Sequence, residues 1–168
     1  MHNYLKMLLW SGFLVLCCFQ PAAATEEYEN SRALRQVTFA KAYFDVANGL
    51  PGKLVNLLGF IDKAHDQLAK EGLKPEFIIG FRSAASAYVT KGSEDYVFDD
   101  EEIAAKKKVQ EWVKRFKEKG IIMEQCVYAA EIYEIDPADI LPEIDRVRNG
   151  YVSMIGYQSK GYSLVPMY

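Results

Sequence analysis

The most informative segment of the sequence for predicting the fold is "GIIMEQCVYAA", residues 120–130. An apolar run at 121–123 leads into Cys126, and an alanine-containing segment follows at once. A short apolar run after a glycine is typical of a buried strand, and the segment after the cysteine favours a short helix over 127–134. The sequence therefore predicts that Cys126 stands where a strand ends and a helix begins.

Strand-like and helix-like segments alternate on both sides of this stretch. Helical periodicity is clear where Leu54, Leu58 and Ile61 recur at steps of three and four. The predicted elements are strands at 36–46, 74–81, 121–126, 143–149 and 162–168, and longer helices at 53–70, 98–120 and 150–161. This alternation predicts one α/β domain over residues 35–168, with a mostly parallel sheet.

Local signals refine three of these elements. Asp99 and Glu102 have the spacing of a capping box at the start of the 98–120 helix. The last helix is expected to carry Val152 and Ile155 on one side. Pro166 has no N–H to donate, so we expect the closing strand to lie at an edge of the sheet.

The first 24 residues predict a cleaved secretory signal peptide. Lys6 supplies a positive charge, residues 7–19 are apolar, and Ala22 and Ala24 are the small residues expected before a cleavage site. We interpret the product as a periplasmic protein of a Gram-negative bacterium. After cleavage the chain would begin with a loose polar leader, residues 25–34, and would have no membrane attachment.

Two other interpretations of this segment are less well supported. A transmembrane anchor needs about 20 apolar residues, and the run at 7–19 has thirteen. A lipid-modified cysteine is expected to follow a small residue, whereas Leu16 precedes Cys17. Loss of the signal would remove Cys17 and Cys18 and would leave Cys126 as the only cysteine. A single cysteine in an exported protein indicates either a reactive thiol or a buried structural residue.

The charge pattern gives no reason to expect a nucleic-acid partner. The chain has a net charge of −3, and its one run of basic residues, 106–108, lies between acidic residues on a predicted helix. We expect those three lysines to form a solvated helix face. Nucleic-acid binding would require a basic patch that this sequence does not contain.

Several classes of chemistry lack the residues they need. Beyond the predicted signal, the chain has one cysteine and one histidine, which is too few ligands for a zinc or iron–sulfur site. His65 falls on the apolar stripe of its helix, which favours a place at the edge of the core. "NGLPGK", residues 48–53, is too short for a phosphate loop. We therefore predict no metal and no cofactor.

The candidate site lies at the carboxyl ends of the strands, where open parallel sheets bind ligands. Cys126 at a helix N-terminus would face free N–H groups, which favour the thiolate. Arg82, after the second strand, either adds a positive charge beside the thiol or forms an ordinary surface ion pair. The loops at this edge also contribute Asn48, Tyr128 and Asn149 as candidate residues for binding an anion or a substrate.

Three segments together resemble the DsrE/DsrF-like family, and in particular its small exported members. They are "FIIGFRSAASAYVTKG" (77–92), "KGIIMEQCVYAAEIYEIDPADILPEI" (119–144) and "VRNGYVSMIGYQSKGYSLVPMY" (147–168). The resemblance implies a five-stranded, mostly parallel sheet flanked by helices, assembly into homotrimers or hexamers, and a role in sulfur trafficking. The position that matches the family's persulfide-bearing cysteine is Cys126. Arg82 matches a common arginine, whereas Ser83 stands where a glycine is usual.

The leading hypothesis is a sulfur carrier or sulfurtransferase-type protein that takes sulfane sulfur as a persulfide on Cys126. Its partners would be copies of itself and a sulfur donor or acceptor, either a protein or a small compound. The alternative is a non-catalytic homo-oligomeric module that binds a small anion and contains a structural cysteine. A third hypothesis is redox sensing through an intermolecular disulfide of Cys126.

Overall fold

The computed structural model describes residues 30–168, so the predicted signal peptide lies outside the described part of the chain. The polypeptide divides into two units, 1–35 and 36–168. In the first, Ser31–Leu34 form the single helical turn α1, within the stretch predicted to be a loose leader. The second unit is an α/β domain, whose limits lie within one residue of the predicted 35–168.

The domain is built on a five-stranded sheet in the order β4-β3-β2-β1-β5. Every neighbouring pair is parallel, so the predicted sheet is confirmed, and β5 is an edge strand as Pro166 suggested. The strands are β1 (Ala40–Val46), β2 (Pro75–Phe81), β3 (Ile122–Cys126), β4 (Asp145–Val147) and β5 (Ser163–Met167). Because Phe81 pairs with Gln125 and Cys126 pairs with Val147, the carboxyl ends of β2, β3 and β4 are level.

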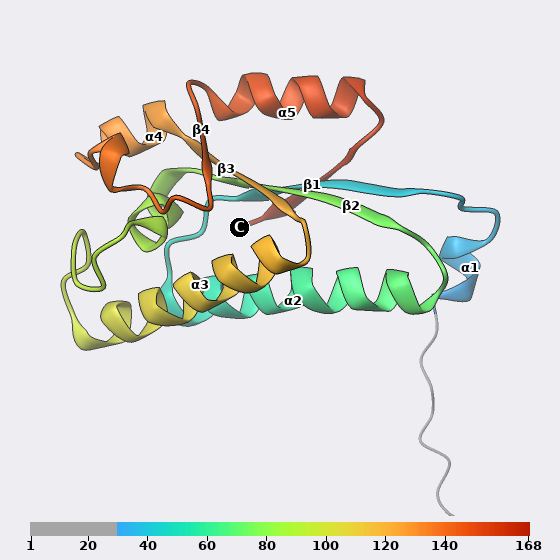
Figure 1. The fold of residues 1–168 in the computed structure, drawn as a ribbon, viewed down its shortest axis with the longest axis horizontal. Helices are drawn as coiled ribbons and strands as arrows, with labels where there is room; N and C mark the ends of the chain where they lie inside the picture. Colours follow the sequence, from blue (N-terminus) through green and yellow to red (C-terminus); the bar gives the residue numbers. More distant parts are fainter. Residues whose placement is uncertain (1–29) are drawn as a thin grey trace, which may run out of the picture. The chain divides into compact units, whose positions relative to one another are not determined.

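One face of the sheet is covered by two long helices, α2 (Pro51–Lys70) and α3 (Asp100–Glu118), which lie side by side in Figure 1. Their apolar stripes pack on alternate strand residues, and this layer is the hydrophobic core. Its fully buried members include Leu54, Leu58, Ile61, Ile79, Val109, Val113 and Phe116. The packing follows the predicted periodicity.

Both long helices begin with recognisable N-terminal signals. α2 begins at Pro51, two residues before the predicted residue 53. Proline is suited to the first turn of a helix, because the N–H that it lacks would have no partner within the helix there. At α3, Asp99 accepts a hydrogen bond from the Glu102 N–H at 2.8 Å, as the capping-box spacing predicted. Glu102 accepts in return from the N–H of Phe98, one residue earlier than in a standard box.

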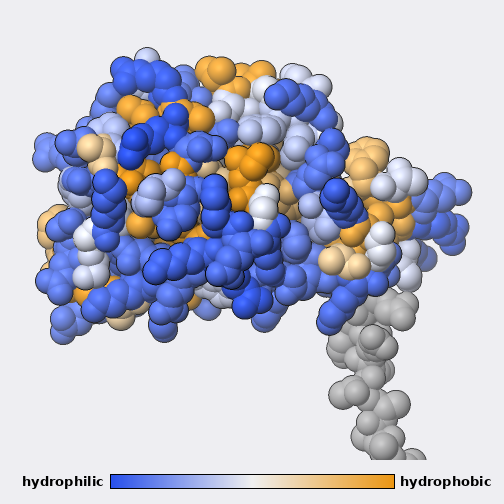
Figure 2. Space-filling view, viewed as in Figure 1, coloured by the Kyte–Doolittle hydropathy of each residue, from blue (hydrophilic) through white to orange (hydrophobic). Residues whose placement is uncertain are grey.

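The opposite face is covered by α5 (Gly150–Ser159), whereas α4 (Val127–Ile132) lies at the carboxyl edge beside the 3-10 helix η1 (Ser83–Val89). A second 3-10 helix, η2 (Pro137–Asp139), follows α4 at the predicted restart. Val152 and Ile155 do share one side of α5, and that side is 65% and 63% exposed. Apolar side chains accordingly appear at the top of the molecule, over α5 (Figure 2).

The prediction that the three lysines at 106–108 form a solvated helix face is wrong for Lys106. Lys107 and Lys108 are exposed, but Lys106 is fully buried and its ammonium donates to the backbone carbonyl of Asp95. It lies next to Ala105 in the turn that faces the core, and burial lowers the pKa of Lys106 to about 8. His65 has the predicted place at the core edge, with its ring edge-on to Phe77 at 5.5 Å.

Within residues 30–168 the structure contains no helix that is both long enough and apolar enough to span a bilayer.

Candidate functional site

Cys126 is the last residue of β3 and immediately precedes α4, so the predicted strand–helix junction is confirmed. Its thiol is free and 7% exposed. Along β3, Cys126 alternates with Gln125, which belongs to the other face and donates to Ser86 in η1 at 2.8 Å. The sulfur therefore lies on the face of the sheet that α5 covers.

Gly150, the first residue of α5, makes room for this sulfur. A Cβ atom at position 150 would lie 3.7 Å from Cys126 Sγ and 3.2 Å from its Cβ. The start of α5 therefore packs directly against the cysteine, and a side chain at position 150 would crowd the Cys126 side chain. Asn149 caps the helix by accepting from the Tyr151 N–H at 3.0 Å. Two helices thus begin beside one thiol.

A pocket of about 410 Å³ opens next to Cys126, beyond the carboxyl ends of β2, β3 and β4. Its walls come from η1, α4 and the start of α5. The lining residues are Arg82, Ser83, Cys126, Tyr128, Ala129, Ile132, Tyr133, Asn149 and Tyr151. The structure therefore brings together four of the five candidate residues chosen from the sequence.

Asn48 is the candidate that does not line this pocket. Its side chain accepts from the Leu50 N–H at 2.9 Å, and the loop that holds it leads into α2 on the other face of the sheet. The adjacent Gly49 carbonyl accepts from the Tyr88 hydroxyl at 3.0 Å, which ties the loop to η1. Asn48 therefore stabilises the turn before α2 and lies outside the lining of the pocket.

Arg82 forms a two-pronged ion pair with Asp45, a buried residue of β1. Its Nε and Nη2 donate to the two carboxylate oxygens at 2.6 and 2.7 Å, and this pairing raises the pKa of Arg82 above its usual value. Tyr168 adds a third donor to Asp45 at 2.9 Å. Of the two expected roles, the structure shows the ion pair, and the positive charge that Arg82 brings to the pocket is neutralised by its partner.

A second arginine near the pocket is also paired. The Arg148 guanidinium lies 4.2 Å from the centre of the Tyr128 ring and donates to Glu131 at 2.7 Å. Stacking on the guanidinium holds the Tyr128 ring in place at the pocket wall. The charge of Arg148 is balanced by Glu131, as that of Arg82 is by Asp45.

Ser83 has a backbone φ of 55°, in the left-handed region that costs a non-glycine residue free energy. Glycine, which the resemblance leads us to expect at this position, adopts such a φ without that cost. Here the serine hydroxyl lies 3.3 Å from the Tyr133 hydroxyl, within hydrogen-bonding distance. Ser83 thus ties η1 to the residue that follows α4, across the floor of the pocket.

A buried polar cluster lies under α5, next to Cys126 on the same face of the sheet. Glu124 Oε1 accepts from the Tyr157 hydroxyl at 3.0 Å, and its Oε2 has no protein partner. Tyr43 reaches across Gly80, where a Cβ would collide with the phenol, toward the register position of Glu124. Burial, followed by the charge of Glu124, raises the pKa of Tyr157 to about 12. This face of the sheet is therefore polar where the opposite face is apolar.

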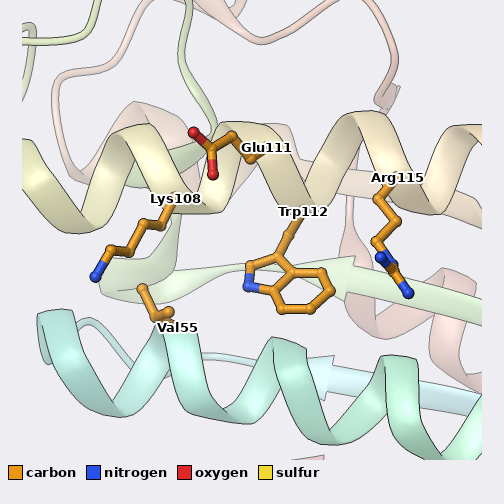
Figure 3. A pocket seen from close by; sticks show the side chains of 5 residues that line it. All are labelled: Val55, Lys108, Glu111, Trp112 and Arg115. Carbon is orange, nitrogen blue, oxygen red and sulfur yellow. The ribbon is translucent and has the colours of Figure 1, made fainter.

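A second hollow, of about 430 Å³, lies on the outer surface between α2 and α3 (Figure 3). Trp112 lies between the two helices there, and Glu111 points away from α2. Arg115, at one end, donates to Asp62 at 2.9 Å. The lining residues of this hollow include no cysteine, histidine or serine, whereas the pocket beside Cys126 contains a thiol. Among the described residues, no cluster of histidine, cysteine or acidic side chains could hold a metal ion.

Comparison of the sequence with family models and with curated proteins found no match. Solved structures do match. The protein of unknown function MTH1491 from Methanobacterium thermoautotrophicum superposes with a TM-score of 0.57 over 76% of this chain and 98% of that protein, at 14% identity. The ychN protein from E. coli gives a TM-score of 0.54 over 75% of this chain and 98% of that protein, at 13% identity. The chain has a DsrE/DsrF-like fold.

Sequence reasoning missed several pocket residues. Tyr151 lies two residues after the candidate Asn149, so the sequence indicates its neighbourhood but not its side chain. Tyr133 and Ile132 come from the end of α4, where no residue had been selected because only the helix start was considered. Asp45 could have been recognised from the sequence, because an acid inside the apolar run "AYFDV" requires a buried partner of opposite charge.

Proposed function

We propose that this protein is a DsrE-like sulfur carrier that holds sulfane sulfur as a persulfide on Cys126. The observation that carries the proposal is the position of the thiol. Cys126 is the single cysteine of the described residues, and it lies in the wall of a pocket at the carboxyl edge of a parallel sheet. In this fold class that edge is where ligands bind.

The chemistry needs only the thiolate and a donor. Cys126 Sγ attacks the outer sulfur of a sulfane donor, a new S–S bond forms, and the donor's own bond to that sulfur breaks. The donor leaves with the bonding electron pair, as a thiolate, a sulfinate or a sulfite. An acceptor thiolate then attacks the outer sulfur of the persulfide, and Cys126 leaves as a thiolate, which restores the starting state.

Two helices begin close to Cys126. α4 begins at the next residue, and α5 begins at Gly150, where a Cβ atom would lie 3.7 Å from Sγ. The thiolate is the nucleophilic form of cysteine, and the free N–H groups of a helix's first turn are the kind of donor that suits an anionic sulfur. Burial of the thiol also limits contact with other protein thiols, which makes an intermolecular disulfide a less suitable role.

Mass spectrometry of the purified protein tests this function. We expect incubation with a sulfane-sulfur donor to add one or more sulfur atoms, reversibly by a reductant, to the native protein. The Cys126→Ser variant is the matched control, because serine keeps the size and removes the thiol, and it should gain nothing. If the native protein gains no sulfur and its thiol resists alkylation until denaturation, the carrier role is excluded and the small-anion binding module becomes the better hypothesis.

The proposal extends to the family and the compartment. The three quoted segments and the shared fold support membership of the small exported branch of the DsrE/DsrF-like family. The apolar run at 7–19 supports export to the periplasm. Expression of the full chain in a Gram-negative host should give a periplasmic product that begins at residue 25, as measured by intact mass and N-terminal sequencing. A cytoplasmic product that retains residue 1 would contradict this assignment.

Self-association into a homotrimer or hexamer is the proposed quaternary state. Its support is the exposure of Val152 and Ile155, side by side on α5, because adjacent exposed aliphatic residues are typical of an interface. We expect Ile155→Asp to reduce the mass measured by sedimentation to that of a monomer. Gln67→Asp, which changes an exposed residue of α2, is the control that should leave the assembly intact. A monomeric native protein would contradict the proposal.

A further inference from the structure

The pocket beside Cys126 has walls that are largely aromatic and aliphatic. Tyr128, Tyr133 and Tyr151 line it, and so does Ile132, which has 78% of its surface exposed. These residues come from α4, from the position just after it and from α5, so the pocket exists only in the folded chain. Exposed apolar side chains around one concave site are typical of a site that receives an apolar group.

The same pocket offers little to a small dianion. Arg82 is the only charged residue among its lining residues, and both carboxylate oxygens of Asp45 already occupy its Nε and Nη2. A dianion such as thiosulfate would lose hydration on entry and would find no unpaired cation in return. An organic group, in contrast, would exchange water for contact with the tyrosine rings.

On the basis of the sulfur transfer proposed above, we infer that the donor is a small organic sulfane-sulfur compound. The class is a thiosulfonate or a persulfide whose sulfur carries an aromatic or bulky apolar group, and inorganic thiosulfate is excluded as the preferred donor. The apolar group lies against Tyr128 and Tyr151 while its outer sulfur reaches Cys126. Asn149 and Ser83, the uncharged polar residues of the pocket, face the polar end of the donor.

A thiosulfonate donor transfers its outer sulfur to Cys126 in a single displacement. The Cys126 thiolate attacks the outer sulfur of RSO2–S⁻, the bond between that sulfur and the sulfonyl sulfur breaks, and RSO2⁻ leaves with the electron pair. The products are the Cys126 persulfide anion and a sulfinate, and no external oxidant or reductant takes part. An organic persulfide, RSS⁻, reacts in the same way and releases RS⁻.

Three donors separate the contributions of the organic group and of charge. Benzenethiosulfonate and methanethiosulfonate have the same reacting group and the same charge, and they differ only in the group that would contact the tyrosines. Thiosulfate has an additional negative charge and no organic group. The rate of sulfur addition to the full mature protein is measured for each by intact mass, and each rate is divided by the rate of the same donor with N-acetylcysteine.

We expect the normalised rate with benzenethiosulfonate to exceed that with methanethiosulfonate by about tenfold, the effect of one well-packed aromatic contact. Tyr151→Ala should reduce this preference several-fold, whereas Phe60→Ala, which removes an exposed ring from α2, should leave it unchanged. Asp45→Asn frees the Arg82 charge and should raise the relative rate with thiosulfate. Circular dichroism of each variant confirms that it is folded.

The results can contradict the inferred donor class without contradicting the proposed sulfur-carrier function. If thiosulfate reacts as fast as benzenethiosulfonate after normalisation, or if Tyr151→Ala leaves the aromatic preference intact, the donor class is wrong while Cys126 remains a carrier. If no donor adds sulfur to the native protein, both the function and the donor class are wrong.

Discussion

The two faces of the sheet differ in how they are closed. On one face, helices of 20 and 19 residues cover alternating apolar strand residues, and the layer is fully packed. On the other, a single helix of 10 residues covers a face that contains Asp45, Glu124 and Cys126. The first face supplies most of the apolar burial that stabilises the domain. The second leaves a pocket and polar groups, and it is where the chemistry can take place.

The largest expected effect comes from the apolar face. Phe116→Ala removes a fully buried ring from α3 and should lower the free energy of unfolding by about 3–5 kcal/mol. Phe60→Ala is the matched control, because that ring on α2 is 59% exposed, and it should change stability by no more than about 0.5 kcal/mol. Denaturant titration at one protein concentration measures both. Equal losses from the two variants would contradict the assignment of the core to this face.

A smaller loss is expected on the polar face. Asp45→Asn keeps the shape of the side chain but removes the charge that pairs with Arg82, so the arginine loses its counter-ion. Because Arg82 retains some contact with solvent, we expect a loss of about 2–3 kcal/mol in the free energy of unfolding, near the value for hydrogen bonds between charged groups. A stability equal to that of the native protein would mean that the ion pair holds the pocket without stabilising the fold.

The smallest effect concerns the one charged side chain that is fully buried beside the apolar layer. Burial lowers the pKa of Lys106 from 10.5 to about 8. Between these pH values the unfolded chain binds more protons than the folded chain, so this residue makes folding more favourable as the pH rises through the window. Relative to Lys106→Met, the native protein should gain about 2 kcal/mol between pH 8 and pH 10.

Chemical unfolding of both proteins across this pH range measures the difference. The comparison cancels the tyrosines, which titrate in both proteins alike. A constant difference across the range would show that Lys106 keeps the same protonation state in the folded and unfolded chains, and the buried ammonium would then need another explanation.

The succession of strands and helices could be predicted from the sequence, because each element must bury a face and burial imposes a period of two or 3.6 residues. The junction at Cys126 could also be predicted, since the strand-forming run and the helical segment adjoin in the chain. The fold places specific requirements on Gly80, Gly150 and Pro51, and the sequence alone does not show the reason for them.

Which side chains meet across the fold could not be predicted in this way. The pairing of Arg82 with Asp45 joins residues 37 positions apart, and no local pattern specifies such a partner. The sequence places Val152 and Ile155 on one side of α5 but does not specify which side faces the sheet, and in the structure Tyr157 faces the sheet and donates to Glu124. The pocket walls come from three separate segments. The pairing of Arg82 with Asp45, which neutralises the charge beside the pocket, therefore depends on how the strands align. The packing of the sheet determines that alignment, and the order of residues alone does not.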